Sequence, residues 1–112
     1  MPDVCPLSVA VHHDEFAVRL ELNGDLDMQT GPLLLSAIDS LLPPADGPVV
    51  LDCSTLRFID ARGLSALLRA HAALAASGRD LGLMNPSDAL RRILTATGLN
   101  DTLPEMRRPP VG

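Results

Sequence analysis

The amino-acid sequence predicts a single α/β domain with a mostly parallel four-stranded sheet, an antiparallel first pair of strands and about three flanking helices. Three observations lead to this prediction. Apolar strands alternate with segments of helical periodicity, a pattern that produces parallel strands through right-handed crossovers. The first two strands follow each other without an intervening helix, which favours an antiparallel pair. The 112 residues show no linker or internal repeat, and this length suits one domain.

The antiparallel pair is predicted at residues 7–12 and 15–22, with a tight turn at His13-Asp14. Apolar and polar residues alternate in the second segment, so one face is expected to be buried and the other to face water. The alternating apolar residues are Phe16, Val18, Leu20 and Leu22. Asn23-Gly24 is normally a strong hairpin signal, but residues 25–27 are too short for a return strand before helix signals begin.

The first helix is predicted to begin at Thr30, as N-cap residue, with Pro32 in its first turn and a stop at Pro43-Pro44. Its apolar residues recur at helical spacing at Leu34, Ala37, Ile38 and Leu41. Residues 48–52 form a short and nearly all-apolar run, as expected of a central strand that is covered on both faces.

A second helix is predicted to begin within residues 60–62 and to end at Ser77-Gly78, because glycine favours the left-handed conformation that ends helices. Its apolar stripe consists of Leu64, Leu67, Leu68, His71, Leu74 and Ala75. Residues 81–84 are the fourth strand, and Ser87 then caps a third helix that ends at Gly98. The buried face of that helix is predicted to consist of Leu90, Ile93, Leu94 and Thr97. 

The predicted domain spans residues 1–112, with a core at about residues 7–104 and a loose, proline-rich tail at 105–112. The net charge of −5 argues against binding to nucleic acid, and an aromatic content of 2% provides few stacking platforms. All nine basic residues are arginine, which with abundant Ala and Pro indicates GC-rich codon usage and a bacterial source. We expect a soluble cytoplasmic protein, because no secretory signal and no membrane-spanning apolar run is found.

Motifs for catalysis, metals and cofactors are missing. Residues 63–67 lack the second glycine of a nucleophile elbow, and no phosphate-binding loop or lysine is present. Cys5 and Cys53 cannot supply a four-ligand zinc site, and Cys53 is expected to be a small buried apolar residue. Asp25 and Asp27 could flank a metal, but nothing nearby completes a ligand set, so we interpret them as a turn that caps backbone groups. We therefore expect no enzymatic activity, no metal and no cofactor.

Three segments form a recognisable series. They are Gly24–Asp27 (GDLD), similar to a G-E-L-D turn; Val49–Leu64 (VVLDCSTLRFIDARGL), similar to a V-V-L-D-L-S-x-V-x-F-I-D-S-S-G-L core; and Leu94–Leu99 (LTATGL), similar to the end of a third helix. Through these segments the chain resembles the STAS domain family, named for sulfate transporters and anti-sigma factor antagonists. The resemblance implies a small α/β domain without catalytic activity of its own.

In the anti-sigma factor antagonist branch of that family, free-standing members bind a GHKL-type serine kinase that sequesters a sigma factor. The kinase phosphorylates the first serine of the D-S-S-G motif, and the complex then breaks. By resemblance, Asp60 matches the aspartate, Ala61 the phosphorylated serine, Arg62 the second hydroxyl residue and Gly63 the glycine. Because Ala61 has no hydroxyl group, phosphorylation at the family position is impossible in this chain.

The resemblance therefore implies an anti-sigma factor antagonist that binds an anti-sigma factor without the usual phospho-switch. The expected partner-binding residues are Asp25, Asp60, Ala61, Arg62, Leu64 and Ser65. Arg62 is mildly unfavourable in the first turn of a helix. Contact with an external anion or an acidic partner would explain an arginine there, and so would simple exposure to water at little cost. Ser54, Thr55 and Ser65 are the nearby hydroxyl residues, but they lie in other registers.

Two alternatives remain open. One is a STAS subunit of another assembly, such as a lipid-transport ABC complex or a stressosome-like scaffold. The other is a domain that binds a nucleotide or another small ligand at the N-terminus of the second helix. We expect a monomer or weak dimer. The family usually continues after Glu105 into a final helix, which residues 106–112 do not provide, so the resemblance does not extend to the partner surface at that edge.

Overall fold

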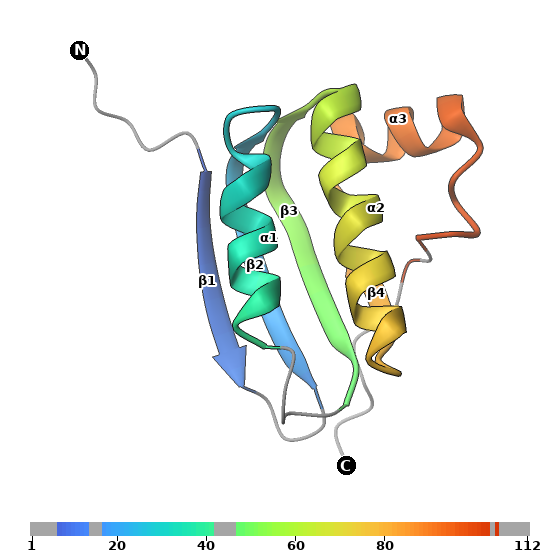
Figure 1. Cartoon of the computed structure of the whole chain (residues 1–112). Coiled ribbons are helices and arrows are strands. Elements are labelled where there is room, and N and C mark those ends of the chain that lie inside the picture. Colours follow the sequence, from blue (N-terminus) through green and yellow to red (C-terminus); the bar gives the residue numbers. More distant parts are fainter. Residues whose placement is uncertain (1–6, 14–16, 42–46, 104, 106–112) are drawn as a thin grey trace.

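The computed structural model describes residues 7–13, 17–41, 47–103 and 105. Its elements are β1 (Leu7–His13), β2 (Val18–Leu26), α1 (Gly31–Asp39), β3 (Val49–Ile59), α2 (Ala61–Ala76), β4 (Leu81–Met84) and α3 (Asp88–Thr97) (Figure 1). The strands form one sheet in the order β1-β2-β3-β4, with β1 antiparallel to β2 and the other neighbours parallel. The predicted fold class is confirmed.

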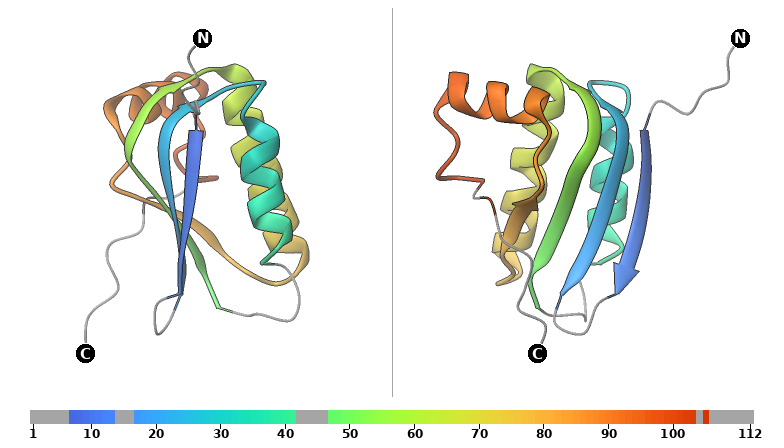
Figure 2. Two further views of the ribbon diagram at one scale, coloured as in Figure 1. Left: turned by 90° about the vertical axis from the view of Figure 1, so that its left-hand side faces the viewer. Right: turned by 180° about the vertical axis from the view of Figure 1, so that it is seen from behind.

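The two long helices lie side by side on one face of the sheet. Figure 2 shows the sheet from its edge, with α1 and α2 on one side and α3 on the other, where α3 covers only one end of the sheet. A row of leucines crosses the helix-covered face, because Leu20 is paired with Leu51 and Leu51 with Leu83. All three side chains are fully buried. Each such burial stabilises the fold by about 1.5–3 kcal/mol.

The two central strands are longer than predicted. We expected β2 to end at residue 22 and β3 at residue 52, but the strands continue to Leu26 and Ile59. Asn23-Gly24 does not form a hairpin turn; instead the β2–β3 register shifts on both sides of it. Gly24 has a φ of 120°, which only glycine adopts readily, so the turn signal serves a bulge within the strand.

The turn before α1 is held by an aspartate rather than by the predicted N-cap residue. Thr30 occupies the N-cap position but makes no side-chain cap; its Oγ1 donates to the carbonyl of Asp25 at 2.8 Å and accepts from the amide of Asp27 at 2.9 Å. Asp27 Oδ1 accepts from the amides of Gln29 and Thr30 at 2.9 and 3.1 Å. The interpretation of these acids as a capping turn is confirmed for Asp27 but wrong for Asp25, which lies in β2 and forms an ion pair with Arg57.

The helix faces follow the predicted periodicity, with two exceptions near helix ends. In α2 the buried stripe includes Leu64, Leu67 and Leu74, Leu68 and His71 are half-buried, and Ala75 is exposed. In α3, Leu90 and Leu94 are buried as predicted and Ile93 is half-buried. Thr97 is exposed, so its predicted place on the buried face is wrong; its Oγ1 instead donates to the carbonyl of Ile93 at 2.6 Å. Gly98 ends α3 in the left-handed conformation, as predicted.

Arg79 forms hydrogen bonds with residues on both sides of the connection between α1 and β3. Its side chain is 5% exposed, and it donates from Nε to the carbonyl of Gly47 at 2.8 Å and from Nη1 to the carbonyl of Leu41 at 2.6 Å. The predicted helix stop at Pro43-Pro44 lies between these two residues, outside the described residues. One buried guanidinium group thus joins the end of the α1 region, the start of β3 and the approach to β4.

The described chain ends at Glu105, which we expected to begin a loose tail. Glu105 forms an isolated parallel bridge with Leu83 and an ion pair with Arg91, in which Nη1 lies 3.3 Å from Oε1. Its position beside β4 is therefore defined. Residues 106–112, the rest of the predicted tail, lie outside the described residues.

Candidate functional site

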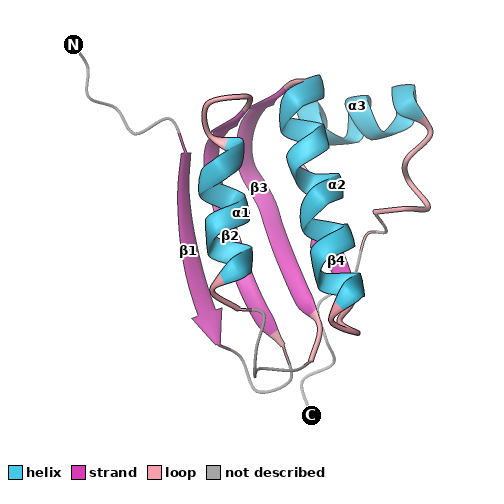
Figure 3. Ribbon diagram, viewed as in Figure 1, coloured by secondary structure: helices cyan, strands magenta, loops and turns pink. Residues whose placement is uncertain are grey.

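The carboxyl ends of β2 and β3 lie next to each other, because Asp25 is paired with Phe58 and Leu26 with Ile59. Both parallel strands lead from there into connections to helices, so the loop before α1 lies beside the start of α2 (Figure 3). Binding sites in open α/β sheets are found at this edge. Asp25 is the next-to-last residue of β2, and the other five predicted site residues all lie within six residues of the end of β3, which makes this edge the candidate site.

Asp60 holds the start of α2. Its backbone is extended, with φ −117° and ψ −173°, and its Oδ1 accepts from the amide of Gly63 at 2.9 Å. The Asp60 carbonyl accepts from the amide of Leu64 at 2.9 Å. Asp60 is therefore the N-cap residue of α2, and its own carboxylate occupies the position where an external anion would bind. This arrangement disfavours the alternative of a nucleotide site at the helix N-terminus.

Two glycines let α2 approach its neighbours closely. A Cβ atom on Gly63 would collide with the backbone carbonyl oxygen of Leu26, at the end of β2. A Cβ atom on Gly31 would lie 3.1 Å from the Cβ of Ala66, which sets the close packing of α1 on α2. The start of α2 is consequently fixed against both β2 and α1, and the exposed side chains of its first turns have defined positions.

Three predicted residues form the exposed tip of α2, namely Ala61, Arg62 and Ser65. Arg62 Nη1 lies 3.5 Å from Sδ of Met28, whose side chain is 61% exposed. Ser65 Oγ donates to the carbonyl of Ala61 at 3.1 Å. We call Ala61, Arg62 and Ser65 the α2 tip. Met28, in the loop before α1, adds an exposed apolar side chain to this surface.

Leu64 does not belong to the exposed surface. We expected it at the partner interface, but it is 5% exposed and lies in the core cluster. The reason is its position on the stripe of α2 that faces the sheet, three residues before Leu67. We therefore leave Leu64 out of the candidate binding surface.

Asp25 lies on the opposite face of the sheet from α2. Residues alternate between the faces of a strand, and Leu26 and Ile59 point toward the helices, so Asp25 and Phe58 point away from them. Asp25 Oδ1 forms an ion pair with Arg57 Nη2 at 3.4 Å, and Phe58 is 48% exposed. The predicted residues thus form two patches, the α2 tip on one face and Asp25 on the other.

A groove of about 360 Å³ adjoins the α2 tip, between α1 and α2. It is lined by Asp27, Met28, Gly31, Pro32, Leu35, Arg62, Ser65, Ala66 and Arg69. We call this the α1–α2 groove. Most of these residues were missed by the sequence reasoning, because the groove depends on how two helices pack. The signal available in the sequence was the seven-residue spacing of Arg62 and Arg69 on a predicted helix.

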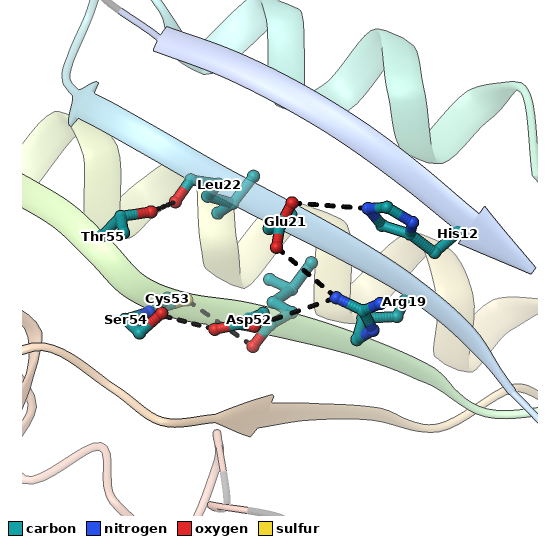
Figure 4. A network of polar contacts seen from close by, with 9 residues as sticks. His12, Arg19, Glu21, Leu22, Asp52, Cys53, Ser54 and Thr55 are labelled. Atoms are coloured by element: carbon teal, nitrogen blue, oxygen red, sulfur yellow. Dashed lines mark hydrogen bonds and ion pairs between the residues drawn. The ribbon is translucent and has the colours of Figure 1, made fainter. Parts of the chain in front are cut away.

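The sheet face that α1 and α2 leave uncovered carries a network of polar contacts across three strands (Figure 4). His12 Nε2 lies 3.3 Å from Oε1 of Glu21, and Arg19 Nη1 lies 3.5 Å from Oε2 of Glu21 and 3.9 Å from Oδ2 of Asp52. Asp52 Oδ1 also accepts from the amide of Ser54 at 3.2 Å. These acids and bases satisfy one another, and in the described residues no group of three or more His, Cys, Asp or Glu side chains could hold a metal ion.

Cys53 lies beside this network but points into the core. It is fully buried, and desolvation together with the negative charge of Asp52 raises its pKa to about 12. A thiol with such a pKa is a poor nucleophile at neutral pH. The interpretation of Cys53 as a small buried apolar residue is confirmed.

The fold and the candidate site define a class of protein. It is a small α/β domain with an exposed helix start at the carboxyl ends of its parallel strands. The family model described as "Mlab, STAS domain" matches residues 9–107. The chain belongs to the STAS domain family, as its three sequence segments predicted. None of the helices in the described parts of the chain has the length and apolar character needed to cross a membrane.

Solved structures with this fold include free-standing proteins and a domain of a transporter. An anti-sigma factor antagonist from Mycobacterium paratuberculosis is 26% identical, over 94% of this chain and 87% of that chain, with a TM-score of 0.77. The unphosphorylated anti-sigma factor antagonist SpoIIAA, from Bacillus, is 21% identical over 90% and 88%, with a TM-score of 0.71. The murine anion transporter Slc26a9 is 14% identical over 80% of this chain and 15% of that chain, with a TM-score of 0.67. No protein of curated function matches the sequence.

Proposed function

We propose that the protein is an anti-sigma factor antagonist, a non-enzymatic cytoplasmic module of bacterial transcription regulation. It binds an anti-sigma factor of the GHKL-type serine kinase class and so frees a sigma factor. The observation that carries the proposal is the α2 tip, an exposed helix start held rigidly by Asp60 and Gly63 beside the exposed side chain of Met28. The similarity to two solved anti-sigma factor antagonists supports this choice.

The binding is constitutive rather than switched by phosphorylation. Ala61 is exposed at the first position of α2, where a serine would be accessible to a kinase, but alanine offers no oxygen to accept a phosphate. Two of the neighbouring hydroxyl groups are engaged locally, since Ser65 Oγ donates to the Ala61 carbonyl and Thr55 Oγ1 to the Leu22 carbonyl at 3.1 Å.

Affinity capture from the native host tests the proposal. The wild-type protein is used as bait and bound proteins are identified by mass spectrometry, with a Leu67→Ala bait as a control for capture by unfolded protein. Stoichiometric recovery of a GHKL-type serine kinase that binds a sigma factor supports the proposed function. Recovery of a specific partner of any other class contradicts it.

The second candidate function is a STAS subunit of a larger assembly, such as a lipid-transport ABC complex or a stressosome-like scaffold. The observation in its favour is that the same fold occurs as a domain of the murine transporter. The capture experiment separates the two candidates, because this alternative requires a permease, an ATPase or other STAS proteins among the bound partners.

A further inference from the structure

The α1–α2 groove combines an apolar surface with charged ends. Its apolar lining comes from Met28, Pro32, Leu35 and Ala66, and its two basic residues, Arg62 and Arg69, both lie on α2. The groove begins at the α2 tip, since Arg62 and Ser65 belong to both. A partner that docks on the tip therefore meets the groove next, along the line where α1 and α2 lie side by side (Figure 1).

The positive charge of this groove is only partly neutralised by the chain itself. Elsewhere Arg19, Arg57 and Arg91 form ion pairs with neighbouring acids. Within the described part of the chain, the hydrogen bond of the Arg62 side chain goes to the sulfur of Met28, and neither Arg62 nor Arg69 forms an ion pair. Two such guanidinium groups on a protein of net charge −5 create a local positive surface, which attracts acidic groups.

Asp27 lines the same groove, and its negative charge offsets only one of the two arginines, so the groove keeps a net positive charge. Its Oδ1 already accepts from the amides of Gln29 and Thr30 in the turn before α1. A carboxylate that is held by backbone amides is oriented toward the turn rather than toward an arginine across the groove.

The spacing of the two arginines restricts what can bind. Seven residues of helix correspond to about 10 Å along the axis, with both side chains on nearly the same face. The anion position at the start of α2 is occupied by the carboxylate of Asp60, which disfavours a phosphate there. The spacing of the arginines matches two carboxylates two turns apart on a partner helix, with apolar side chains between them.

We infer that the α1–α2 groove accepts an acidic amphipathic helix of the partner, with Arg62 and Arg69 as the two charge contacts and Met28, Pro32 and Leu35 as the apolar contacts. This inference rests on the proposed function for the identity of the partner. What it adds is that the partner's docking segment is an acidic amphipathic helix. It also gives Arg62, at an electrostatically unfavourable helix position, a binding role.

A binding assay with a defined probe tests the groove directly. The probe is a fluorescent synthetic helical peptide with a stripe of leucines and two glutamates seven residues apart. The control peptide has the same sequence except that both glutamates are replaced by glutamines. The wild-type protein should bind the glutamate peptide at least about tenfold more tightly than the glutamine peptide, and salt should weaken the binding. Absence of binding, equal binding of both peptides, or displacement of the peptide by ATP or phosphate would overturn the inference.

Variants assign the effect to the two arginines. Arg62→Gln and Arg69→Gln should each reduce the preference for the glutamate peptide, and the double variant should abolish it. Arg92→Gln is the matched control, because Arg92 is exposed on α3, away from the groove, and this variant should bind like the wild type. A loss of preference in the control as large as in the double variant would contradict a role for the groove.

The same variants separate this inference from the proposed function. If the wild-type protein captures an anti-sigma factor and the double variant Arg62→Gln/Arg69→Gln captures it equally well, the inference fails and the proposed function stands. If the glutamate peptide binds through Arg62 and Arg69 but no anti-sigma factor is captured, the proposed function fails and the acidic character of the docking segment stands.

Discussion

Gly63 packs so closely on the backbone carbonyl of Leu26 that a single methyl group would overlap with that carbonyl oxygen. Because the obstacle is backbone at the end of β2, it cannot move aside as a flexible side chain would. The first turn of α2 is thereby held against the sheet. The position of the α2 tip thus depends on the contact of α2 with the end of β2, the strand that leads into α1.

Gly63→Ala should lower the free energy of unfolding by about 3 kcal/mol, at the upper end of what overpacking costs. Urea denaturation followed by circular dichroism measures this change. Gly31→Ala is the comparison, since its new Cβ would meet only the Cβ of Ala66, at 3.1 Å, and should cost less. Equal losses would mean that α2 can shift away from β2 freely.

Leu67→Ala should lower the free energy of unfolding by about 2–5 kcal/mol, because Leu67 is 0% exposed in the core between α2 and the sheet. Arg69→Ala, on the exposed side of the same helix, should change it by no more than about 0.5 kcal/mol. Denaturant melts of both variants provide the measurement. A large effect of the arginine variant would contradict the assigned helix face.

The thiol of Cys53 should stay protonated and unreactive in the folded protein, because burial and Asp52 raise its pKa to about 12 from an ordinary value of 9.0. A Cys5→Ser variant leaves Cys53 as the single thiol. At pH 8 it should react with a thiol reagent only after denaturant is added. Rapid labelling of the native variant would show that the site opens.

The same pKa predicts how stability depends on pH. A pKa that is higher in the folded state contributes stability that is fully present below pH 9 and is lost as the pH rises toward 12. Cys53→Ala should remove this part of the alkaline decline in the free energy of unfolding, measured from pH 8 to 11. An identical decline in both proteins would assign it to other groups.

Incubation with the captured kinase and ATP should leave the intact mass of the protein unchanged, because Ala61 has no hydroxyl group. Ala61→Ser restores the family's residue at an exposed position and should take up one phosphate. Phosphorylation of the wild type at Ser54, Thr55 or Ser65 would show that the switch has moved to another residue.

Ala61→Asp should weaken partner binding at least tenfold, about 1.4 kcal/mol, because it places a new negative charge beside Asp60 at the contact surface. The fold should be little affected, since an acidic residue at a helix start is locally favourable. Calorimetric titration against the captured partner measures the effect. Ala96→Asp, on the exposed side of α3, is the control and should bind normally.

The order and type of all seven elements could be predicted from the sequence, because the apolar periodicities of two and of about 3.6 residues are clear along most of the chain. The ends of β2 and β3 could not, since Asn23-Gly24 suits a tight turn as well as the bulge that it forms. A local signal does not distinguish these two uses. The strand continues because a parallel partner is available beside it.

The candidate site could be predicted only in part. The resemblance identified the exposed start of α2, and the structure places Ala61, Arg62 and Ser65 there. It did not predict that Leu64 is buried or that Asp25 points to the opposite face, because both depend on the orientation of strands and helices in space. Met28 and the α1–α2 groove arise from the packing of Gly31 against Ala66, which no sequence periodicity reveals.

The hydrogen bonds of Arg79 bracket the connection between α1 and β3, since they reach the carbonyls of Leu41 and Gly47 on either side of it. The end of α1 and the start of β3 lie at the end of the sheet opposite the α2 tip (Figure 1). A fluorescent label or an affinity tag inserted between these two residues would have both of its attachment points anchored to the domain. Such an insertion offers a way to immobilise the protein with its proposed binding surface facing solution.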